Sequence, residues 1–327
     1  MKIALVGATG EVGRVMARVL EEQGLRPERL RFFASKRSAG TGLPFAGTAV
    51  TVEELTPQWV PPGTFDYVIM SAGAALSKWF APLAAQRGAV VIDNSACWRG
   101  DPDKLLIVPE INGALLKGWR GIVSNPNCST IQMVLGLYKI RQKWGLKNVV
   151  VSTYQAVSGA GRRGIEELEA QERGSREFCK FAAPIHRNVV PKIDDFLPDG
   201  FTKEEMKMVN EPRKIFGDPN FSCWPTAVRV PVLCGHSEAV FAETREPFGT
   251  LENLLDVMGS QEHVKLCLEP VVTPLDVAGS DSVFISRVRS FDDRRFLQWS
   301  VADNLRVGAA VNAVRILLKH AELNGLL

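Results

Sequence analysis

The chain has 327 residues, of which 46% are hydrophobic and 23% are charged, and its formal net charge is +3. This composition is that of an ordinary globular protein and excludes a disordered or fibrous chain. The mild charge, without any dense run of Lys and Arg, argues against nucleic-acid binding. The length is enough for two domains.

The N-terminal sequence MKIALVGATG predicts a first strand rather than a targeting segment, because its short apolar run soon becomes glycine-rich. No stretch approaches the roughly 18 consecutive apolar residues of a transmembrane helix. The six cysteines form no Cys-x-x-Cys pair, and no Cys/His cluster has the spacing of a metal site. We therefore expect a cytoplasmic protein with reduced thiols, no membrane partner and no metal.

The first part of the chain alternates strands with helices. Short apolar runs at residues 2–6, 30–34, 65–72, 89–95 and 121–126 read as buried strands, and residues 12–23 read as an amphipathic helix. Strands separated by helices predict a doubly wound parallel sheet of the Rossmann-like type, with helices on both faces. We place this predicted domain at residues 1–127.

The second part predicts an α+β domain at residues 128–303. A helix ended by Gly145 follows Cys128, and β-rich runs follow at residues 149–159, 227–244, 283–291 and 296–303. Few helices separate these strands, which indicates a mostly antiparallel sheet. Helices predicted at about 162–173, 203–215 and 250–259 would cover one face. A final amphipathic helix at 304–327 is expected to pack back on the first domain.

The sequence GATGEVG stands between the first strand and the first helix. Gly7 and Gly10 would let the backbone approach a pyrophosphate, and Gly13 would let the helix pack closely on the strand. The helix N-terminus would attract the anion. The spacing is G-x-x-G-x-x-G rather than the usual G-x-G-x-x-G, and a purely structural turn is the alternative.

The turn after the second strand predicts the cofactor type. It reads ASKRSAG, with Lys36, Arg37 and Ser38 and no acidic residue. NAD sites place Asp or Glu here for the ribose hydroxyl, whereas NADP sites place cations for the 2′-phosphate. The turn therefore favours NADP, and a solvated basic turn is the alternative.

The sequence SNPNCST indicates a reactive thiol. Pro126 and its Asn neighbours end a strand, and Cys128 then opens a helix. The positive end of the helix dipole stabilises a thiolate, which is the nucleophilic form of cysteine. Cys97, which also follows a strand end, is the nearest alternative.

A nucleophilic cysteine needs a proton partner, and histidine is the first candidate. Among the four histidines, His320 lies in the last turn of the C-terminal helix, His263 is predicted on an exposed helix, and His186 lies in a loop. His236 follows a predicted strand that carries Arg229, an arrangement that suits a proton shuttle beside a carboxylate site. His236 is therefore preferred, although a histidine in a sheet is often only structural.

Several motifs occur in one order between residues 7 and 310: GATGEVG, SKRSAG, SNPNCST, YQAVSGAG, EEMK, VRVPVLCGHSEA and DNLRVGAA. Together they resemble the motif set of bacterial aspartate-β-semialdehyde dehydrogenases. The resemblance implies NADPH-dependent reduction of β-aspartyl phosphate to aspartate semialdehyde and phosphate, in the biosynthesis of lysine, threonine, methionine and isoleucine. It also implies a homo-oligomer, either a dimer or a tetramer.

The resemblance assigns roles to named residues. Cys128 would be the nucleophile, His236 the general acid/base, and Gln155 the residue that orients the acyl group. The substrate would be bound by Arg229 at its carboxylate, Glu204 at its amine, and Arg99, Lys207 and Asn127 at its phosphate. The cofactor would contact Thr9, Gly10, Glu11, Val12, Arg37, Ser38, Ser158, Gly159 and Asn304, in addition to the glycine turn.

The residue pattern agrees in part with these assignments and leaves alternatives open. Glu204 and Lys207 are three residues apart on one helix, so they face the same side, although an ordinary surface ion pair has the same spacing. A related acyl-phosphate reductase, such as N-acetyl-glutamyl-phosphate reductase, would share the Rossmann domain and the cysteine. A malonyl-CoA reductase would share most motifs. A non-catalytic relative would be expected to lack Cys128 or His236, and both are present.

Overall fold

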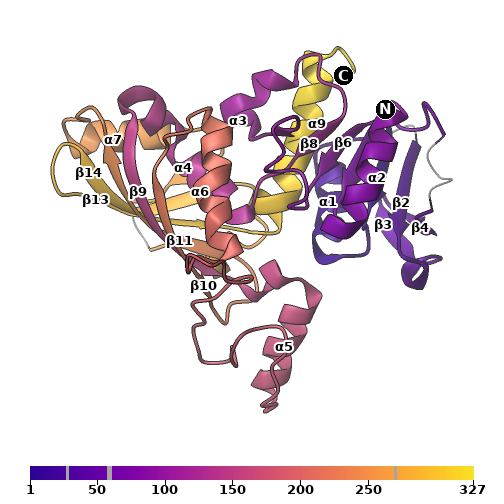
Figure 1. Cartoon of the computed structure of the whole chain (residues 1–327), viewed down its shortest axis with the longest axis horizontal. Coiled ribbons are helices and arrows are strands. Elements are labelled where there is room, and N and C mark those ends of the chain that lie inside the picture. Colours follow the sequence, from indigo (N-terminus) through magenta and orange to yellow (C-terminus); the bar gives the residue numbers. More distant parts are fainter. Residues whose placement is uncertain (27–28, 57–60, 269–270) are drawn as a thin grey trace. The chain divides into compact units, whose positions relative to one another are not determined.

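The computed structural model describes residues 1–26, 29–56, 61–268 and 271–327. The chain forms two compact units, Met1–Pro126 with Ala309–Leu327 and Asn127–Gly308. Each unit contains its own β-sheet (Figure 1). Within the described residues, no helix is both long enough and apolar enough to cross a membrane.

The first unit is built on an eight-stranded sheet with the order β3-β4-β2-β1-β5-β6-β8-β7. Its strand pairs are parallel except for β3 with β4, which form an edge hairpin. The strands are β1 (Lys2–Val6), β2 (Arg29–Ala34), β3 (Gly42–Phe45), β4 (Thr48–Glu54), β5 (Tyr67–Met70), β6 (Val90–Asp93), β7 (Leu105–Leu106) and β8 (Ile122–Ser124). The helices are α1 (Glu11–Glu22), α2 (Ala74–Gln86), α3 (Pro109–Asn112) and α9 (Asn312–Leu323).

Helices cover both faces of this sheet. Phe80 and Ala84 of α2 pack on the face that carries Val68 and Met70. Successive side chains of a strand point to opposite faces, so Tyr67 lies on the other face. There its hydroxyl group is 2.8 Å from Nδ1 of His320 on α9, which also contacts α1. The predicted doubly wound sheet is confirmed.

The second unit is built on a six-stranded sheet with the order β10-β9-β11-β14-β13-β12. The four central strands are antiparallel, whereas β10 and β12 pair in parallel at the two edges. The strands are β9 (Leu146–Gln155), β10 (Cys223–Arg229), β11 (His236–Thr244), β12 (Val264–Leu266), β13 (Val283–Ser290) and β14 (Arg295–Ala302). The helices are α4 (Cys128–Trp144), α5 (Arg162–Glu172), α6 (Lys203–Phe216), α7 (Leu251–Gly259) and α8 (Pro274–Val277).

Helices α4, α6 and α7 pack against this sheet, and α4 also packs against both α6 and α7 (Figure 1). Along β9 the side chains alternate, with Val149, Val151 and Thr153 buried beneath the helices and Val150 on the opposite face. Gly145 ends α4 in the left-handed region, at φ 67°, which explains why a glycine stands there. The face of the sheet beneath the helices therefore forms the core of the unit, and side chains on the opposite, outer face are more exposed.

Two local predictions were wrong. His263 lies beyond the end of α7, at φ 60°, immediately before β12, so it is not on a helix. The final helix is not regular from its start, because residues Arg306–Val311 are π-helical and α9 begins only at Asn312. Such π-helical turns are frequent at functional sites.

Glu238 on β11 is a fully buried carboxyl group in the second unit. Neither oxygen has a hydrogen-bond partner among the described residues. Burial raises the pKa of Glu238 well above its usual value, so the folded protein holds this side chain protonated over a pH range in which the unfolded chain releases the proton. Its contribution to stability is therefore complete below about pH 4.3 and is lost progressively as the pH rises.

Glu238→Gln is expected to remove this pH dependence. The free energy of unfolding of the variant, relative to that of the wild type, should rise between about pH 5 and pH 8. The slope of this rise is at most about 1.4 kcal/mol per pH unit. Thermal unfolding followed by circular dichroism across this range measures the difference. Glu243→Gln, on the same strand but partly exposed, is the control and should give a flat difference. A constant difference for Glu238→Gln would contradict the protonated state.

Candidate active site

Cys128 is the first residue of α4, and Asn127 caps this helix. The Asn127 side-chain oxygen accepts hydrogen bonds from the backbone N–H groups of Ser129, at 3.1 Å, and Thr130, at 3.2 Å. The cap fixes the first turn, so the helix dipole acts on the Cys128 thiol. The helix start that SNPNCST predicts is confirmed.

Gly308 packs directly against Cys128. A Cβ atom built on Gly308 would lie 2.5 Å from the Cys128 Cβ and 3.0 Å from its Cα. These distances leave no room for a side chain at residue 308. Gly308, within the π-helical segment Arg306–Val311, therefore packs closely against Cys128.

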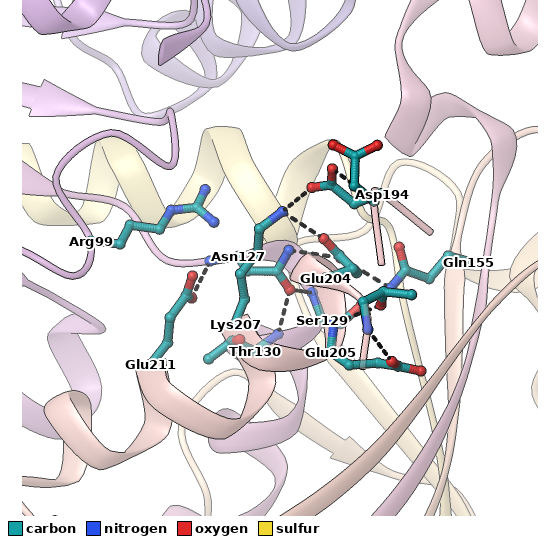
Figure 2. Close-up of polar contacts among 12 residues, drawn as sticks. Arg99, Asn127, Ser129, Thr130, Gln155, Asp194, Glu204, Glu205, Lys207 and Glu211 are labelled. Atoms are coloured by element: carbon teal, nitrogen blue, oxygen red, sulfur yellow. Dashed lines mark hydrogen bonds and ion pairs between the residues drawn. The ribbon is translucent and has the colours of Figure 1, made fainter. Parts of the chain in front are cut away.

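A polar network centred on Glu204 lies next to the start of α4 (Figure 2). Glu204 Oε1 accepts hydrogen bonds from Asn127 Nδ2, at 2.9 Å, and from Gln155 Nε2, at 3.2 Å. Its Oε2 is 2.9 Å from Lys207 Nζ, and Lys207 is in turn 3.2 Å from an Asp194 oxygen. The pair of Glu204 and Lys207 is therefore not an ordinary surface ion pair, because Glu204 is only 5% exposed.

Glu204 is held as a carboxylate. Burial on its own would raise its pKa, but the Lys207 charge and the hydrogen bonds from Lys207, Asn127 and Gln155 outweigh burial and lower the pKa to about 2. A carboxylate is the group that pairs with an ammonium ion. The network also connects Gln155, at the end of β9, to the residue beside Cys128.

The side chains of Arg229 and His236 both lie against Gly159. A Cβ atom on Gly159 would lie 2.9 Å from Arg229 Nη1 and 3.1 Å from His236 Nε2. Arg229 ends β10 and His236 begins β11, and both are buried. Burial lowers the pKa of Arg229, whereas the nearby charges of Glu204 and Cys128 raise it. Arg229 thus lies within electrostatic range of the thiol and beside His236.

His236 is oriented by the backbone. Its Nδ1 accepts a hydrogen bond from the Ala156 N–H at 3.1 Å, so this nitrogen carries no proton and Nε2 carries it in the neutral ring. Burial, followed by the charge of Arg229, lowers the pKa of His236 to about 3. Nε2 has no hydrogen-bond partner among the described residues. His236 is therefore neutral near pH 7 and offers one N–H at Nε2.

The glycine turn of the first unit fits a dinucleotide. A Cβ atom on Gly7 would lie 2.3 Å from the Ser71 carbonyl oxygen, and one on Gly13 would lie 2.1 Å from the Gly7 carbonyl oxygen. Gly7 and Gly13 are therefore required for packing, whereas Gly10 faces more open space. Since Gly10 has no side chain to cap α1, the first amides of that helix are available to an anion.

The remaining predicted cofactor residues fall into two groups. Thr9, Glu11 and Val12 lie in the glycine turn and the first turn of α1, while Arg37 and Ser38 form a short 3-10 turn after β2. In the second unit, Asn304 Nδ2 donates to Ser158 Oγ at 3.0 Å, and Asn304 Oδ1 accepts from the Gly235 N–H at 2.8 Å. Ser158, next to Gly159, and Asn304 are thus brought together.

Arg99 lies in the first unit, where its Nη2 donates to the Asn94 carbonyl oxygen at 3.0 Å. The alternative nucleophile Cys97 also lies there, and burial and the Asp93 carboxylate raise the pKa of its thiol. Two further thiols, Cys223 and Cys234, have pKa values raised to about 12, mainly by burial. These three thiols are poor sources of thiolate.

Sequence reasoning missed three residues of this site. Gly308 belongs to the motif DNLRVGAA, but its contact with Cys128 depends on the folded π-helical segment. Asp194, in the left-handed region at φ 68°, binds Lys207 from a distant loop. Glu211 accepts a hydrogen bond from the Asn127 N–H. Only Glu211 had a usable signal, since it lies two helical turns after Glu204.

Comparison with known proteins identifies the family. Residues 2–119 match the semialdehyde dehydrogenase NAD-binding domain, and residues 137–307 match the semialdehyde dehydrogenase dimerisation domain. The aspartate-semialdehyde dehydrogenase of Aquifex aeolicus is 45% identical, over 96% of each chain. The chain belongs to the aspartate-semialdehyde dehydrogenase family.

Further members of the aspartate-semialdehyde dehydrogenase family agree with this assignment. The enzyme of Bacillus subtilis is 40% identical over 99% of this chain and 98% of its own. The crystal structure of aspartate semialdehyde dehydrogenase II from Vibrio cholerae, complexed with ASA, is 40% identical and covers 98% of both chains, with a TM-score of 0.94. The family and the fold that the sequence motifs predict are thus confirmed.

Among the described residues, no group of three or more His, Cys, Asp or Glu side chains is arranged to hold a metal ion.

Proposed function

We propose that this chain is an NADPH-dependent aspartate-semialdehyde dehydrogenase that reduces β-aspartyl phosphate through a thioester on Cys128. The observation that carries this proposal is the arrangement around Cys128. A thiol at a helix start, a neutral His236 with its proton at Nε2, the buried Arg229 and the ionised Glu204 belong to one compact unit. We also propose that residues 128–303 form the catalytic and dimerisation domain, and that residues 1–127 form the NADP-binding domain, on which the C-terminal helix α9 packs.

The charged groups match the substrate. Arg229, whose guanidinium group remains charged in proteins, would pair with the α-carboxylate. Glu204 would receive the substrate ammonium group, and Lys207, Arg99 and Asn127 would bind the phosphate. Together these residues offer one cation to a carboxylate, one anion to an amine and further donors to a phosphate.

The acylation step uses the start of α4. The Cys128 thiolate attacks the acyl carbon, a C–S bond forms, the C–O bond to phosphate breaks, and inorganic phosphate leaves. The positive end of α4 stabilises the thiolate before the attack. Gln155, held by Glu204, would orient the acyl oxygen.

The reduction step uses His236. NADPH, when bound, supplies the hydride that reduces the thioester carbon. As the carbonyl oxygen gains charge, the neutral His236 would stabilise it by donating a hydrogen bond from Nε2–H, and the oxygen becomes the aldehyde carbonyl when the C–S bond breaks and the Cys128 thiolate leaves. The low pKa of His236 keeps the ring neutral, so it acts as a donor and does not form an ion pair with the thiolate.

Arg37 is proposed to select NADP over NAD. Arg37→Ala is expected to raise the KM for NADPH about 10- to 100-fold, because a charge-assisted contact to the 2′-phosphate is lost, and to leave the KM for NADH nearly unchanged. Steady-state kinetics with both nucleotides measure the ratio. Arg18→Ala, on the exposed face of α1, controls for the loss of general positive charge. An equal change with both nucleotides would contradict this role.

We infer that the outer face of the six-stranded sheet forms the contact of a homodimer. Its strands carry partly or fully exposed apolar side chains, with Val150 45% and Trp224 58% exposed and Tyr154 packed on Trp299. An apolar sheet face of this kind is typical of an interface between subunits. The matched dimerisation domain, residues 137–307, contains this sheet.

Trp224→Glu is expected to shift the protein from dimer to monomer, because it places a charge on this face beside the exposed Val150. Size-exclusion chromatography with light scattering measures the mass. Trp79→Glu, at an exposed tryptophan of the first unit, is the control and should leave the mass unchanged. A Trp224→Glu variant that remains a dimer would place the interface elsewhere.

The proposed function is tested by phosphate-dependent reduction of NADP with aspartate semialdehyde. We place this reaction in the cytoplasm, where NADPH is supplied. Strong activity that requires phosphate or arsenate is the expected result. A folded protein that binds NADP but does not react would indicate another acyl phosphate or an acyl-CoA thioester, such as malonyl-CoA, and reduction assays with those substrates would then distinguish them.

A further inference from the structure

The backbone of Asn127, the residue before Cys128, is hydrogen-bonded by a second residue of α6 in addition to Glu204. The Asn127 N–H donates to Glu211 Oε2 at 2.6 Å (Figure 2). Glu211 is 5% exposed and lies seven residues after Glu204, on the same side of α6. Asn127 is therefore held twice by one helix, at its side chain by Glu204 and at its backbone by Glu211.

This contact replaces half of a capping box. In a capping box, an acidic or Gln side chain at the third helical position accepts the hydrogen bond of the N-cap N–H. The third position of α4 is Thr130, whose hydroxyl is buried without a hydrogen-bond partner among the described residues. Asn127 supplies the N-cap half of the motif by accepting the Thr130 N–H, and Glu211 supplies the missing acceptor from another helix.

Helix α6 is itself anchored to the sheet. Thr202 and Glu205 form a complete capping box at its start. Glu205 Oε1 also accepts the Ala227 N–H of β10 at 3.0 Å. The β10 strand ends at Arg229. Because α6 is fixed to β10 at one end, its side chains can set the position of the α4 start relative to Arg229.

From this geometry we propose that Glu211 is a positioning residue for the nucleophile: its side-chain oxygen fixes the Asn127 peptide and thereby the place and direction of the Cys128 side chain. The proposal rests on the proposed role of Cys128. The Glu211 side chain accepts the Asn127 N–H, so we propose that it acts through Asn127. The required feature is the acceptor oxygen at the correct distance, and not the negative charge.

Three substitutions separate the acceptor from the charge. Glu211→Gln keeps an oxygen in place and should keep kcat within about 3-fold of the wild type. Glu211→Asp keeps the charge but withdraws the oxygen, and Glu211→Leu removes both; each should lower kcat about 10- to 100-fold, as expected for a misplaced reacting group. The KM for NADPH should not change. Asn210→Ala, at an exposed position of the same helix, is the control.

The second readout is alkylation of Cys128 by iodoacetamide, measured by mass spectrometry across a pH series. The rate profile of Cys128 should change in the Asp and Leu variants, whereas Asn210→Ala should leave that profile unchanged. If the Leu variant does not fold, the Asp variant carries the test. Wild-type kcat in the Asp variant, or a Gln variant as impaired as it, would overturn the proposal.

These outcomes are independent of the proposed function. If Cys128→Ala keeps full activity, the role of Cys128 fails, yet the alkylation profiles still report whether Glu211 positions the Cys128 side chain. If Cys128→Ala is inactive and the Glu211 variants have wild-type kcat and alkylation profiles, only the positioning role of Glu211 fails.

Discussion

Cys128→Ala is expected to lower kcat by at least ~10⁴-fold, because the variant lacks the atom that forms the thioester. The fold should persist, since Cys128 begins α4 and its helix cap belongs to Asn127. The measurement is steady-state reduction of NADP by aspartate semialdehyde, together with thermal unfolding to confirm that the variant is folded.

Cys97→Ser is the matched control for Cys128→Ala. The Cys97 thiol also follows a strand end, but burial and Asp93 raise its pKa. The control should retain activity within a few-fold of the wild type. Loss of activity in Cys97→Ser combined with full activity in Cys128→Ala would transfer the nucleophilic role to the first unit.

Gly308→Ala is expected to lower kcat by ~100-fold or more. The added Cβ would lie 2.5 Å from the Cys128 Cβ and 3.0 Å from its Cα, so either the π-helical segment or the start of α4 must move. A displacement of about 1 Å at a reacting group costs on the order of 100-fold in rate. The atoms in contact belong to the Cys128 residue itself, and a rotation of a distant side chain cannot relieve the overlap.

The measurement for Gly308→Ala is kcat alongside the alkylation rate of Cys128. Gly259→Ala is the control, because a Cβ there would meet only Leu266 at 3.7 Å, an ordinary contact. Gly259→Ala should keep wild-type kinetics. A Gly308→Ala variant with wild-type kcat would show that the nucleophile tolerates the shift, and that the π-helical segment does not position it.

Periodic and local signals in the sequence were sufficient to predict the fold class. Alternating short apolar strands and helices predict the doubly wound sheet, and Gly145 marks the end of α4. The parallel pairing of β10 with β9 was not predictable, because register between distant strands is set by tertiary packing. The π-helical start of the last helix also had no signal in the apolar pattern.

The reactive residues of the site were easier to predict than their supports. Cys128 is visible because a polar turn and a helix start surround it, and Glu204 with Lys207 is visible from helical spacing. Gly308 and Asp194 act through contacts across long sequence separations, and their residue types are common in turns. The tautomer of His236 depends on the hydrogen bond from the Ala156 N–H to Nδ1, and only the folded backbone brings these two groups together.

The central claim is that Cys128 carries the acyl group. It is tested most directly by mixing the enzyme with β-aspartyl phosphate in the absence of NADPH, quenching the mixture in acid and mapping the acyl group by mass spectrometry. We expect one thioester per chain, on the peptide that contains Cys128, with an equal amount of phosphate released. An acyl group on a different residue, or phosphate release that occurs only with NADPH and leaves no adduct, would contradict the claim.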